Sequence, residues 1–419
     1  MYRVLILSHM YPNPINSIYG IFVHEQVREL TKQGCEVKVI SPVPWSPIPV
    51  RWIKKKWHQY AQVPQKEIKE GCEVYHPRYL SFPNSHFVEM SGFFYYWGIK
   101  NLVNKIYQDF KFELIHAHAV LPDGYGALLL KKQYKCPIVV TVHGVDIYST
   151  INKNEKCRRS ILNVLKKADK IIVVSSVLKK LVGKYLNRQD IFVINNGIDL
   201  DRIFRRRSEM KANFGGKKIL LSVGSLIERK GHIFVLKAMA RIIGEVPNIV
   251  YLVVGDGPEQ KKLKEEAHKL NLSDKVVFLG NICCEKVMEY MSICNIFVLP
   301  SWDESFGVVY IEAMAHGKPV IGCYGEGIED IVTDGDSGIL ADPKDLKSLE
   351  KVILRLLTDE KFAIQIGKKG QEVVARDFVL SNKAKEIIRL YKRLFPKSPA
   401  RLTMDQAIIR GSGGNNMLL

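Results

Sequence analysis

Short apolar runs alternate with amphipathic stretches along almost the whole chain. Six runs predict strands in the first half, at residues 4–7, 36–40, 114–118, 138–142, 170–175 and 191–194. Six more predict strands in the second half, at residues 219–223, 250–255, 276–279, 296–299, 319–322 and 338–340. Continuous apolar strands joined by helices are typical of parallel sheets with both faces covered. The pattern therefore predicts an α/β chain with two Rossmann-like, doubly wound units.

The length and the connecting segments support a division into domains. A chain of 419 residues exceeds what one hydrophobic core usually spans. Residues 195–216 are polar and basic and lack apolar periodicity, so we place the seam there. The expected parts are residues 1–205, 206–378, a terminal helix over 379–396, and a tail over 397–419 that is rich in Ser, Gly and Asn and expected to be disordered.

The segment from Glu304 to Glu312 is the most informative about which ligand the chain binds. A buried strand and a loop precede it, and residues 308–316 predict a helix closed by a glycine. The free amides of Phe306, Gly307 and Val308 should point out of the helix start, which suits a phosphate. Glu312 lies one turn deeper on the face of Val308, where a carboxylate can accept hydrogen bonds from a ribose. An isolated Glu pair is more often solvated, so its neighbours decide the interpretation.

Two strand ends of the first half carry candidate ligand-binding residues. Gly20 opens a helix after a long loop and permits close backbone approach to a ligand, although it is equally a common turn residue. His143 follows the fourth predicted strand and can hydrogen-bond a ligand through a neutral imidazole, or serve a structural role. His116 and His118 share one face of the preceding strand and fit the core or a supporting position better than catalysis.

Two strand ends of the second half carry further candidates. Arg229 and Lys230 precede a helix start and could neutralise a diphosphate leaving group, with a solvated cation pair as the plain alternative. Asn281 and Ile282 follow another strand and could offer backbone groups to a base edge. Ligands of doubly wound sheets bind beyond the carboxyl ends of the strands, so two facing units would place all these residues in one interdomain cleft.

Composition limits the partners and the cellular compartment that we expect. The formal charge of +19 favours contact with polyanions such as nucleic acid, an anionic membrane or phosphate-bearing small molecules, without choosing among them. The eight cysteines lack a C-x-x-C pair, and no cluster predicts a metal site, so a reducing compartment is expected. No apolar window approaches 18 residues, which predicts a cytoplasmic protein.

Together these motifs closely resemble the retaining glycosyltransferases of family 4. The resemblance is carried by Gly20, His-Gly-Val-Asp at 143–146, Asn-Gly-Ile-Asp at 196–199, Arg-Lys-Gly at 229–231, Val-Gly-Asp-Gly-Pro-Glu at 254–259, and Pro-Ser at 300–301 with the Glu pair. It covers the chain in order to about residue 378. It implies a GT-B fold, with acceptor on the first domain, nucleotide-sugar on the second, and the last helix returning onto the first domain.

The resemblance also implies roles for individual residues. Glu312 would hold the ribose, the amides of residues 306–308 the diphosphate, and Glu304 the hydroxyls of the donor sugar. Lys230 would stabilise the departing phosphate, with Gly20 close to it, and His143 would lie near the reacting carbon. The family implies retention of configuration, no metal and no cofactor, with a UDP- or GDP-linked sugar as co-substrate.

One position departs from the family pattern. Ser225 stands where these enzymes often have Arg, so that either Arg229 substitutes for it or the phosphate clamp is weaker.

Three segments of the first half, at residues 20–27, 41–44 and 76–80, resemble enzymes that build bacterial cell-surface polysaccharides, including teichuronic-acid types. Trp45, residues 51–58 and residues 93–97 with Lys100 mix aromatic and cationic side chains. Such mixtures suit an anionic bilayer surface, and they predict peripheral docking to reach a lipid-linked or glycan acceptor. The alternative is that the aromatics pack inside and the lysines are solvated.

Two other functions remain open from the sequence. A nucleotide-sugar epimerase would share the architecture but needs a different acidic constellation from Glu304 and Glu312. A basic nucleic-acid-binding protein would explain the charge, but the chain has no recognisable helix-turn-helix, zinc finger or RNA-recognition motif, so nucleic acid is not an expected partner.

Overall fold

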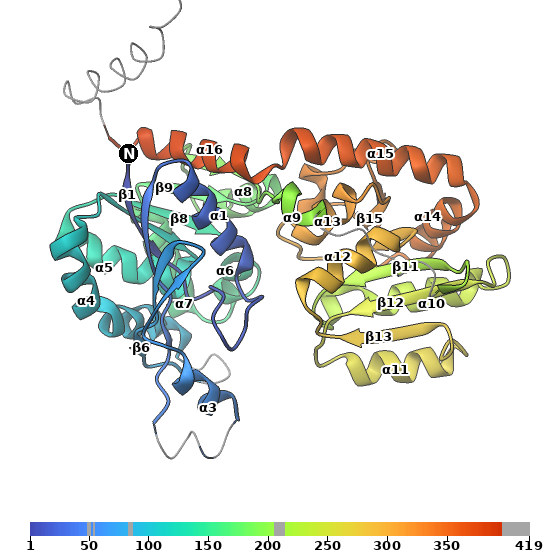
Figure 1. The fold of residues 1–419 in the computed structure, drawn as a ribbon, viewed down its shortest axis with the longest axis horizontal. Coiled ribbons are helices and arrows are strands. Elements are labelled where there is room, and N and C mark those ends of the chain that lie inside the picture. The colour runs from blue at the N-terminus through green and yellow to red at the C-terminus, as the bar shows by residue number, and fades with distance from the viewer. Residues whose placement is uncertain (48–51, 53–54, 83–86, 205–213, 396–419) are drawn as a thin grey trace, which may run out of the picture.

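A computed structural model describes residues 1–47, 52, 55–82, 87–204 and 214–395. The expected disordered tail lies outside the described residues, as do parts of the basic segment 51–58 and of the seam. Figure 1 shows two α/β halves side by side, joined at the level of α9 (Leu200–Phe204) and by the long path from α15 (Glu360–Asp377) to α16 (Leu380–Lys392). The predicted α/β class with two doubly wound units is confirmed.

The first half is built on an eight-stranded sheet in the order β10-β9-β8-β7-β1-β2-β5-β4. Its strands are β1 (Arg3–Leu7), β2 (Glu36–Ile40), β4 (Lys66–Lys69), β5 (Cys72–Tyr75), β7 (Leu114–His118), β8 (Ile138–Val142), β9 (Lys170–Val173) and β10 (Ile191–Val193). Its helices are α1 (Ile21–Lys32), α3 (Lys55–Gln62), α4 (Ser91–Phe110), α5 (Tyr125–Tyr134), α6 (Val145–Tyr148), α7 (Glu155–Lys167) and α8 (Ser176–Gly183). A separate small pair joins β3 (Val43–Pro44) to β6 (Arg78–Tyr79).

The second half has a six-stranded parallel sheet in the order β13-β12-β11-β14-β15-β16. Its strands are β11 (Lys218–Val223), β12 (Ile249–Val254), β13 (Val276–Gly280), β14 (Ile296–Val298), β15 (Val320–Cys323) and β16 (Ile339–Ala341). The remaining helices are α10 (His232–Ile242), α11 (Gln260–Lys269), α12 (Cys284–Ile293), α13 (Val308–Ala315) and α14 (Leu346–Thr358).

The twelve predicted strands are all present, with ends that differ by at most two residues. They could be predicted because both sheet faces are buried. In β1, for example, Leu5 and Leu7 join one core cluster while Val4 and Ile6 join the cluster on the other face. The β4–β5 hairpin was not predicted, because its outer strand alternates half-buried and exposed positions at the sheet edge and contains no apolar run.

Helix α16 lies against the first half, although it follows the second half in sequence (Figure 1). The hydroxyl of Tyr391 lies 2.7 Å from Nδ1 of His116, and the ring of Phe395 stacks on Tyr2 with 5.5 Å between centroids. The segments that cross between the halves are themselves hydrogen-bonded: the amide of Ile198 donates to the Phe378 carbonyl at 2.9 Å, and the Leu380 amide donates to the Ile198 carbonyl at 3.0 Å. The chain therefore ends on the domain in which it began.

Candidate functional site

The carboxyl ends of the two sheets meet at two loops. Gly144 follows β8 in the first half, and Ser305 lies in the loop between β14 and α13 in the second. Gly144 has a φ of 115°, and a Cβ built on it would overlap the Ser305 hydroxyl. Glycine is therefore required there both by its conformation and by the close approach of the other half. This contact brings His143 next to the segment that the sequence predicts to hold a donor.

The start of α13 offers free backbone amides. Gly307 precedes the helix with a φ of 82°, and the helix begins at Val308. Within the described part of the chain, the amides of Phe306, Gly307 and Val308 donate to no recorded acceptor. The Phe306 side chain is buried and packs on Phe378, with 5.9 Å between ring centroids, so the turn is fixed from beneath. Free amides at a helix start attract an anion through both hydrogen bonding and the helix dipole.

Lys230 and Glu304 form an ion pair beside that helix start. They meet because the loop after β11 passes close to the loop after β14, where Gly231 faces the carbonyl of Pro300 without room for a side chain. The carboxylate of Glu304 also accepts a hydrogen bond of 3.2 Å from Ser301 Oγ. Burial favours the neutral acid, but Lys230 outweighs it, so the pKa of Glu304 is lowered and the carboxylate is ionised at neutral pH.

Arg229 contacts the same loop. Its Nη1 donates to the backbone carbonyl of Asp303 at 2.8 Å, whereas Ser225, the usual Arg position, is exposed. Two cations thus flank residues 303–304, although their contact with a phosphate remains a prediction. The amide of Glu304 is held in addition by Glu326, a residue that the sequence did not single out, whose Oε2 accepts it at 2.7 Å.

Glu312 lies one turn into α13 and is partly buried. Burial raises its pKa to about 7, and the neighbouring Glu25 of α1 adds to the shift while Arg202 of α9 opposes it. Arg202 itself pairs with Glu25, with 2.6 Å between Nη1 and Oε1. Of the two acids Glu304 and Glu312, Glu304 is buried at 8% exposure and Glu312 is half-buried. The role of Glu312 toward a ribose stays a prediction.

Three other predicted residues lie in other loops. Asn281 is exposed and Ile282 half-buried in the loop from edge strand β13 to α12, and their contact with a base stays a prediction. Gly20 has a φ of 71°, and a side chain there would collide with the backbone of Met10. The structure therefore gives Gly20 a steric role within its own domain, and its proximity to a phosphate stays a prediction.

His143 belongs to a stack of imidazoles at the ends of β7 and β8. Its Nε2 lies 3.2 Å from Nδ1 of His118, and the ring of Phe22 is 4.9 Å away between centroids. His116 and His118 are fully buried, as expected for core positions. Burial, helped by the nearby His9, lowers the pKa of His143 to about 3. The imidazole is therefore neutral near pH 7 and suited to hydrogen bonds with hydroxyl groups.

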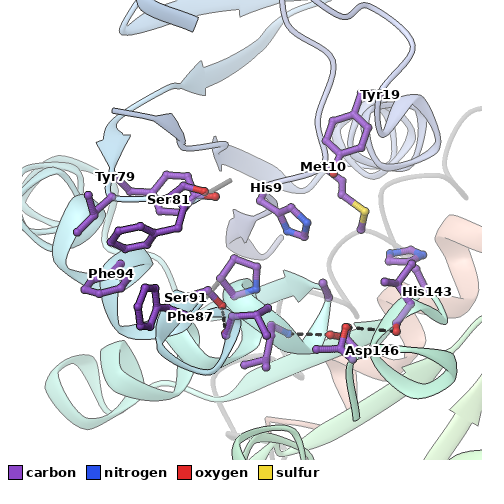
Figure 2. A pocket seen from close by; sticks show the side chains of 18 residues that line it. His9, Met10, Tyr19, Tyr79, Ser81, Phe87, Ser91, Phe94, His143 and Asp146 are labelled. Atoms are coloured by element: carbon purple, nitrogen blue, oxygen red, sulfur yellow. Dashed lines mark hydrogen bonds between the residues drawn. The ribbon is translucent and has the colours of Figure 1, made fainter. Parts of the chain in front are cut away.

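A cavity of about 330 Å³ opens beside His143 in the first half (Figure 2). His9, which follows β1, lines it together with aromatic side chains from residues 79–94. Nδ1 of His9 lies 2.8 Å from the buried carboxylate of Asp123. Sequence reasoning missed both residues. His9 could have been found by the strand-end rule, but Asp123 lies 114 positions away and carries no local signal.

Two family models match successive parts of the chain. "Glycosyltransferase Family 4" matches residues 20–202, and "Glycosyl transferases group 1" matches residues 204–373. A putative teichuronic acid biosynthesis glycosyltransferase of Bacillus subtilis is 27% identical over 398 residues, which cover 93% of this chain and 98% of that protein. An uncharacterized glycosyltransferase of Methanocaldococcus jannaschii is 32% identical over 288 residues, covering 68% and 77%.

A synthase and two solved structures are also similar to this chain. The N-acetyl-alpha-D-glucosaminyl L-malate synthase of Bacillus anthracis is 29% identical over 68% of this chain and 74% of its own. Sucrose-phosphate synthase from Thermosynechococcus elongatus superposes with a TM-score of 0.79 at 24% identity, covering 94% and 99%. An Anabaena protein solved with UDP and glucose gives 0.72 at 19% identity, covering 94% and 100%. The expected GT-B fold is thereby confirmed.

Proposed function

This chain belongs to the glycosyltransferases, with a family 4 domain followed by a group 1 domain, and we propose that it is a retaining, metal-independent hexosyltransferase of cell-surface polysaccharide synthesis. The donor would be a UDP- or GDP-linked sugar, and the acceptor a glycan or a lipid-linked glycan. The polysaccharide role is supported by the likeness to the Bacillus subtilis teichuronic acid protein over nearly the whole of both chains. UDP is supported by the related fold solved with UDP and glucose.

One observation carries the proposal. Lys230, Arg229 and the free amides at the start of α13 gather at the carboxyl ends of the second sheet, where Gly144 of the first half touches the same loop. A diphosphate seated on those amides would have Lys230 beside it. The sugar attached to that diphosphate would then lie toward Glu304 and His143. Positive charge is thus available where negative charge develops as the phosphate departs.

The proposed reaction is a displacement on one face of the donor sugar. The bond from the anomeric carbon to the phosphate oxygen breaks, and the acceptor hydroxyl oxygen forms its new bond on that same face. The hydroxyl proton passes to the departing phosphate oxygen, so no side chain has to act as base. Lys230 and the amides stabilise the leaving diphosphate, and the neutral His143 can hydrogen-bond a hydroxyl near the reacting carbon.

Nucleotide-sugar binding and product analysis test this function. A thermal-shift panel of UDP-, GDP-, ADP- and dTDP-sugars should show one donor that raises the unfolding temperature through binding to the native state. Transfer from that donor should then proceed in excess EDTA, and NMR of the product should show the anomeric configuration of the donor. An inverted product, or activity abolished by EDTA and restored by a divalent cation, would contradict the retaining or metal-independent part. Transfer to none of a broad set of glycans and glycolipids would contradict the function itself.

We also propose that the first half docks peripherally on the cytoplasmic face of the membrane. No helix among the described residues combines the length and apolarity needed to cross a bilayer. Trp52 is 83% exposed and Trp97 58% exposed, and Nζ of Lys100 lies 4.1 Å from the Trp97 ring centroid. Exposed aromatic and cationic side chains suit an anionic interface. Absence of co-sedimentation with phosphatidylglycerol vesicles at low salt would refute this docking, and neutral vesicles serve as the control.

A further inference from the structure

His9 is held in a defined orientation inside the first half. Its Nδ1 lies 2.8 Å from Oδ2 of Asp123, and its backbone amide donates to Oδ1 of the same carboxylate at 2.9 Å. Asp123 is fully buried, whereas the side chain of His9 is 25% exposed. A carboxylate can only accept, so Nδ1 carries the proton and Nε2 is the ring atom left for the cavity. Figure 2 shows the ring between the aromatic side chains on one side and His143 on the other.

The charges around this cavity disfavour an anion. None of the described lining residues is Lys or Arg, although the chain carries a net charge of +19. Asp146 lines the wall and accepts hydrogen bonds from the amides of Val120 and Leu121 at 2.8 and 3.2 Å, and Asp123 lies directly behind His9. A phosphate or carboxylate in the cavity would therefore meet two acidic groups and at most one imidazolium.

The rest of the wall is mostly apolar and contains a cluster of aromatic rings. Phe82 lies 5.1 Å from Phe87 and 5.7 Å from Phe94 between ring centroids, and all three line the cavity. Phe82 and Phe87 are 37% and 54% exposed, so part of each ring remains open. A wall of aromatic rings with a few placed hydrogen-bonding groups is the usual composition of a site for an uncharged, partly apolar ligand.

We propose that this cavity binds the acceptor as an uncharged sugar ring, which lies against Phe82, Phe87 and Phe94 and hydrogen-bonds through a hydroxyl to Nε2 of His9. The inference rests on the proposed glycosyl transfer and assigns its acceptor class. His9 is then an acceptor-binding residue, and Asp123 is a positioning residue that fixes which ring nitrogen faces the acceptor. An acceptor whose reacting ring carries a phosphate or a uronic carboxylate is disfavoured.

Matched pairs of small acceptors test the charge preference. The neutral probes are phenyl β-glucoside, galactoside, mannoside and N-acetylglucosaminide, and the anionic probes are phenyl glucuronide and phenyl glucoside 6-phosphate. Binding to the full chain is measured by calorimetry and by saturation-transfer NMR. We expect at least one neutral probe to bind about ten-fold more tightly than both anionic probes, which corresponds to one unfavourable charge contact. Equal or tighter binding of an anionic probe, or no neutral binding up to about 10 mM, would overturn the proposal.

Variants of His9 and Asp123 test the residues. His9→Ala should weaken the neutral probe about ten-fold through loss of one hydrogen bond, and His9→Gln should recover part of that loss. Asp123→Asn should weaken it about three-fold, because the ring is no longer fixed as the Nδ1–H tautomer. The control is His58→Ala, which removes an exposed imidazole of the same half. Unchanged probe binding in His9→Ala would overturn the assignment.

A second measurement separates this inference from the proposed function. UDP and GDP binding, measured on the same variants, should change less than about two-fold, because His9 lies in the first half whereas Arg229, Lys230 and the amides of residues 306–308 lie in the second. If His9→Ala lost nucleotide and neutral-probe binding equally, the effect would be structural and the assignment of His9 would fail. If sugar transfer occurs but only anionic acceptors serve, the glycosyltransferase function stands and the acceptor class is wrong.

Discussion

The two halves present different chemistry at the carboxyl ends of their sheets. The second half presents Arg229, Lys230 and free helix amides, with Glu304 ionised beside them. The first half presents His143, an imidazole that burial keeps neutral, a wall of phenylalanines and the His9–Asp123 pair. The strong positive charge of the chain is thus not shared evenly by these two groups of residues. It is available on the side where a leaving phosphate would collect negative charge.

The difference indicates that the donor and the acceptor of one reaction can be recognised by two kinds of interaction. A diphosphate is bound by charge, which acts over several ångströms and tolerates small shifts in position. A sugar hydroxyl is bound by short, directional hydrogen bonds and by ring contacts, which need a fixed geometry. The first half supplies that geometry from buried groups such as Asp123 and Asp146.

Removal of Lys230 should have the largest effect. Lys230→Ala takes away the cation nearest the proposed leaving group and leaves Glu304 without its partner, so kcat/KM for transfer should fall about 10²- to 10³-fold. Steady-state kinetics with the donor found in the thermal-shift panel measures this. Lys237→Ala is the matched control, because this lysine is 44% exposed and pairs with Glu266 on the neighbouring helix. Unaltered turnover in Lys230→Ala would refute its role.

A side chain at Gly144 should disturb the contact between the two halves. Gly144→Ala would strain a residue with a φ of 115° and push its Cβ into Ser305, so we expect kcat to fall about 10- to 100-fold through misplacement of His143. Adding Ser305→Gly should restore part of the loss, because it removes the atoms that collide. The double variant is compared with both single variants at saturating donor. Full activity in Gly144→Ala would show that the contact does not position the site.

The two acids of the donor segment should respond to pH with opposite signs. Glu304 has a lowered pKa, so its ionised form stabilises the fold at neutral pH, and that contribution is lost as pH falls through the folded-state value. Glu304→Gln should therefore lower the free energy of unfolding at pH 7 by about 2 kcal/mol, and this cost should shrink progressively as pH falls below about 4.5. Urea unfolding of both proteins across this pH range measures the change.

Glu312 provides the opposite case. Its pKa is raised to about 7, so the folded chain holds the proton more firmly than the unfolded chain, and stability declines as pH rises from about 4.5 to about 7. Glu312→Gln should raise the free energy of unfolding at pH 8 by on the order of 2 kcal/mol and have little effect at pH 4.5. Loss of stability at pH 8 in this variant would show that Glu312 has a partner that holds it ionised.

Salt should produce the smallest effect and distinguish the two sides directly. Raising NaCl from about 50 to about 500 mM screens Lys230 and Arg229, so the KM for the donor should rise about three- to ten-fold. The KM for a neutral acceptor should change less than about two-fold, because its proposed site uses hydrogen bonds and ring contacts. Equal salt dependence of the two KM values would contradict the proposed difference between donor and acceptor binding. A sodium acetate series controls for a specific effect of chloride.

Much of the fold and part of the site followed from local patterns. Buried parallel strands are continuous apolar runs, so β1, β7 and β8 were predicted with ends within one residue of those observed. The rule that ligands bind at carboxyl strand ends points to His143, Lys230 and the start of α13. Gly144, next to His143, contacts Ser305 of the loop that also carries Glu304, the partner of Lys230. The role of each residue toward a substrate is a separate matter and stays a prediction.

What the sequence did not predict depends on contacts between distant segments. The pairing of Asp123 with His9 is created by the order of strands in the sheet, and neither residue's neighbours indicate it. The sequence leaves open whether the aromatic segment 93–97 packs inside or faces solvent, and in the structure its side chains do both. Tyr95 packs in the core with Ile99 of the same helix face, while Phe93 and Trp97 are exposed on another. Helical spacing could have indicated this division once the helix itself was assumed.

The bond between the two crossing segments sets how the halves of this molecule can move. Ile198 is joined by backbone hydrogen bonds to both Phe378 and Leu380, and α16 anchors the second crossing to the first domain through Tyr391. Because two chain crossings lie side by side and are hydrogen-bonded to each other, we expect rotation about their common line to be the easiest relative motion of the halves. Such a rotation would change the distance between Lys230 and His143.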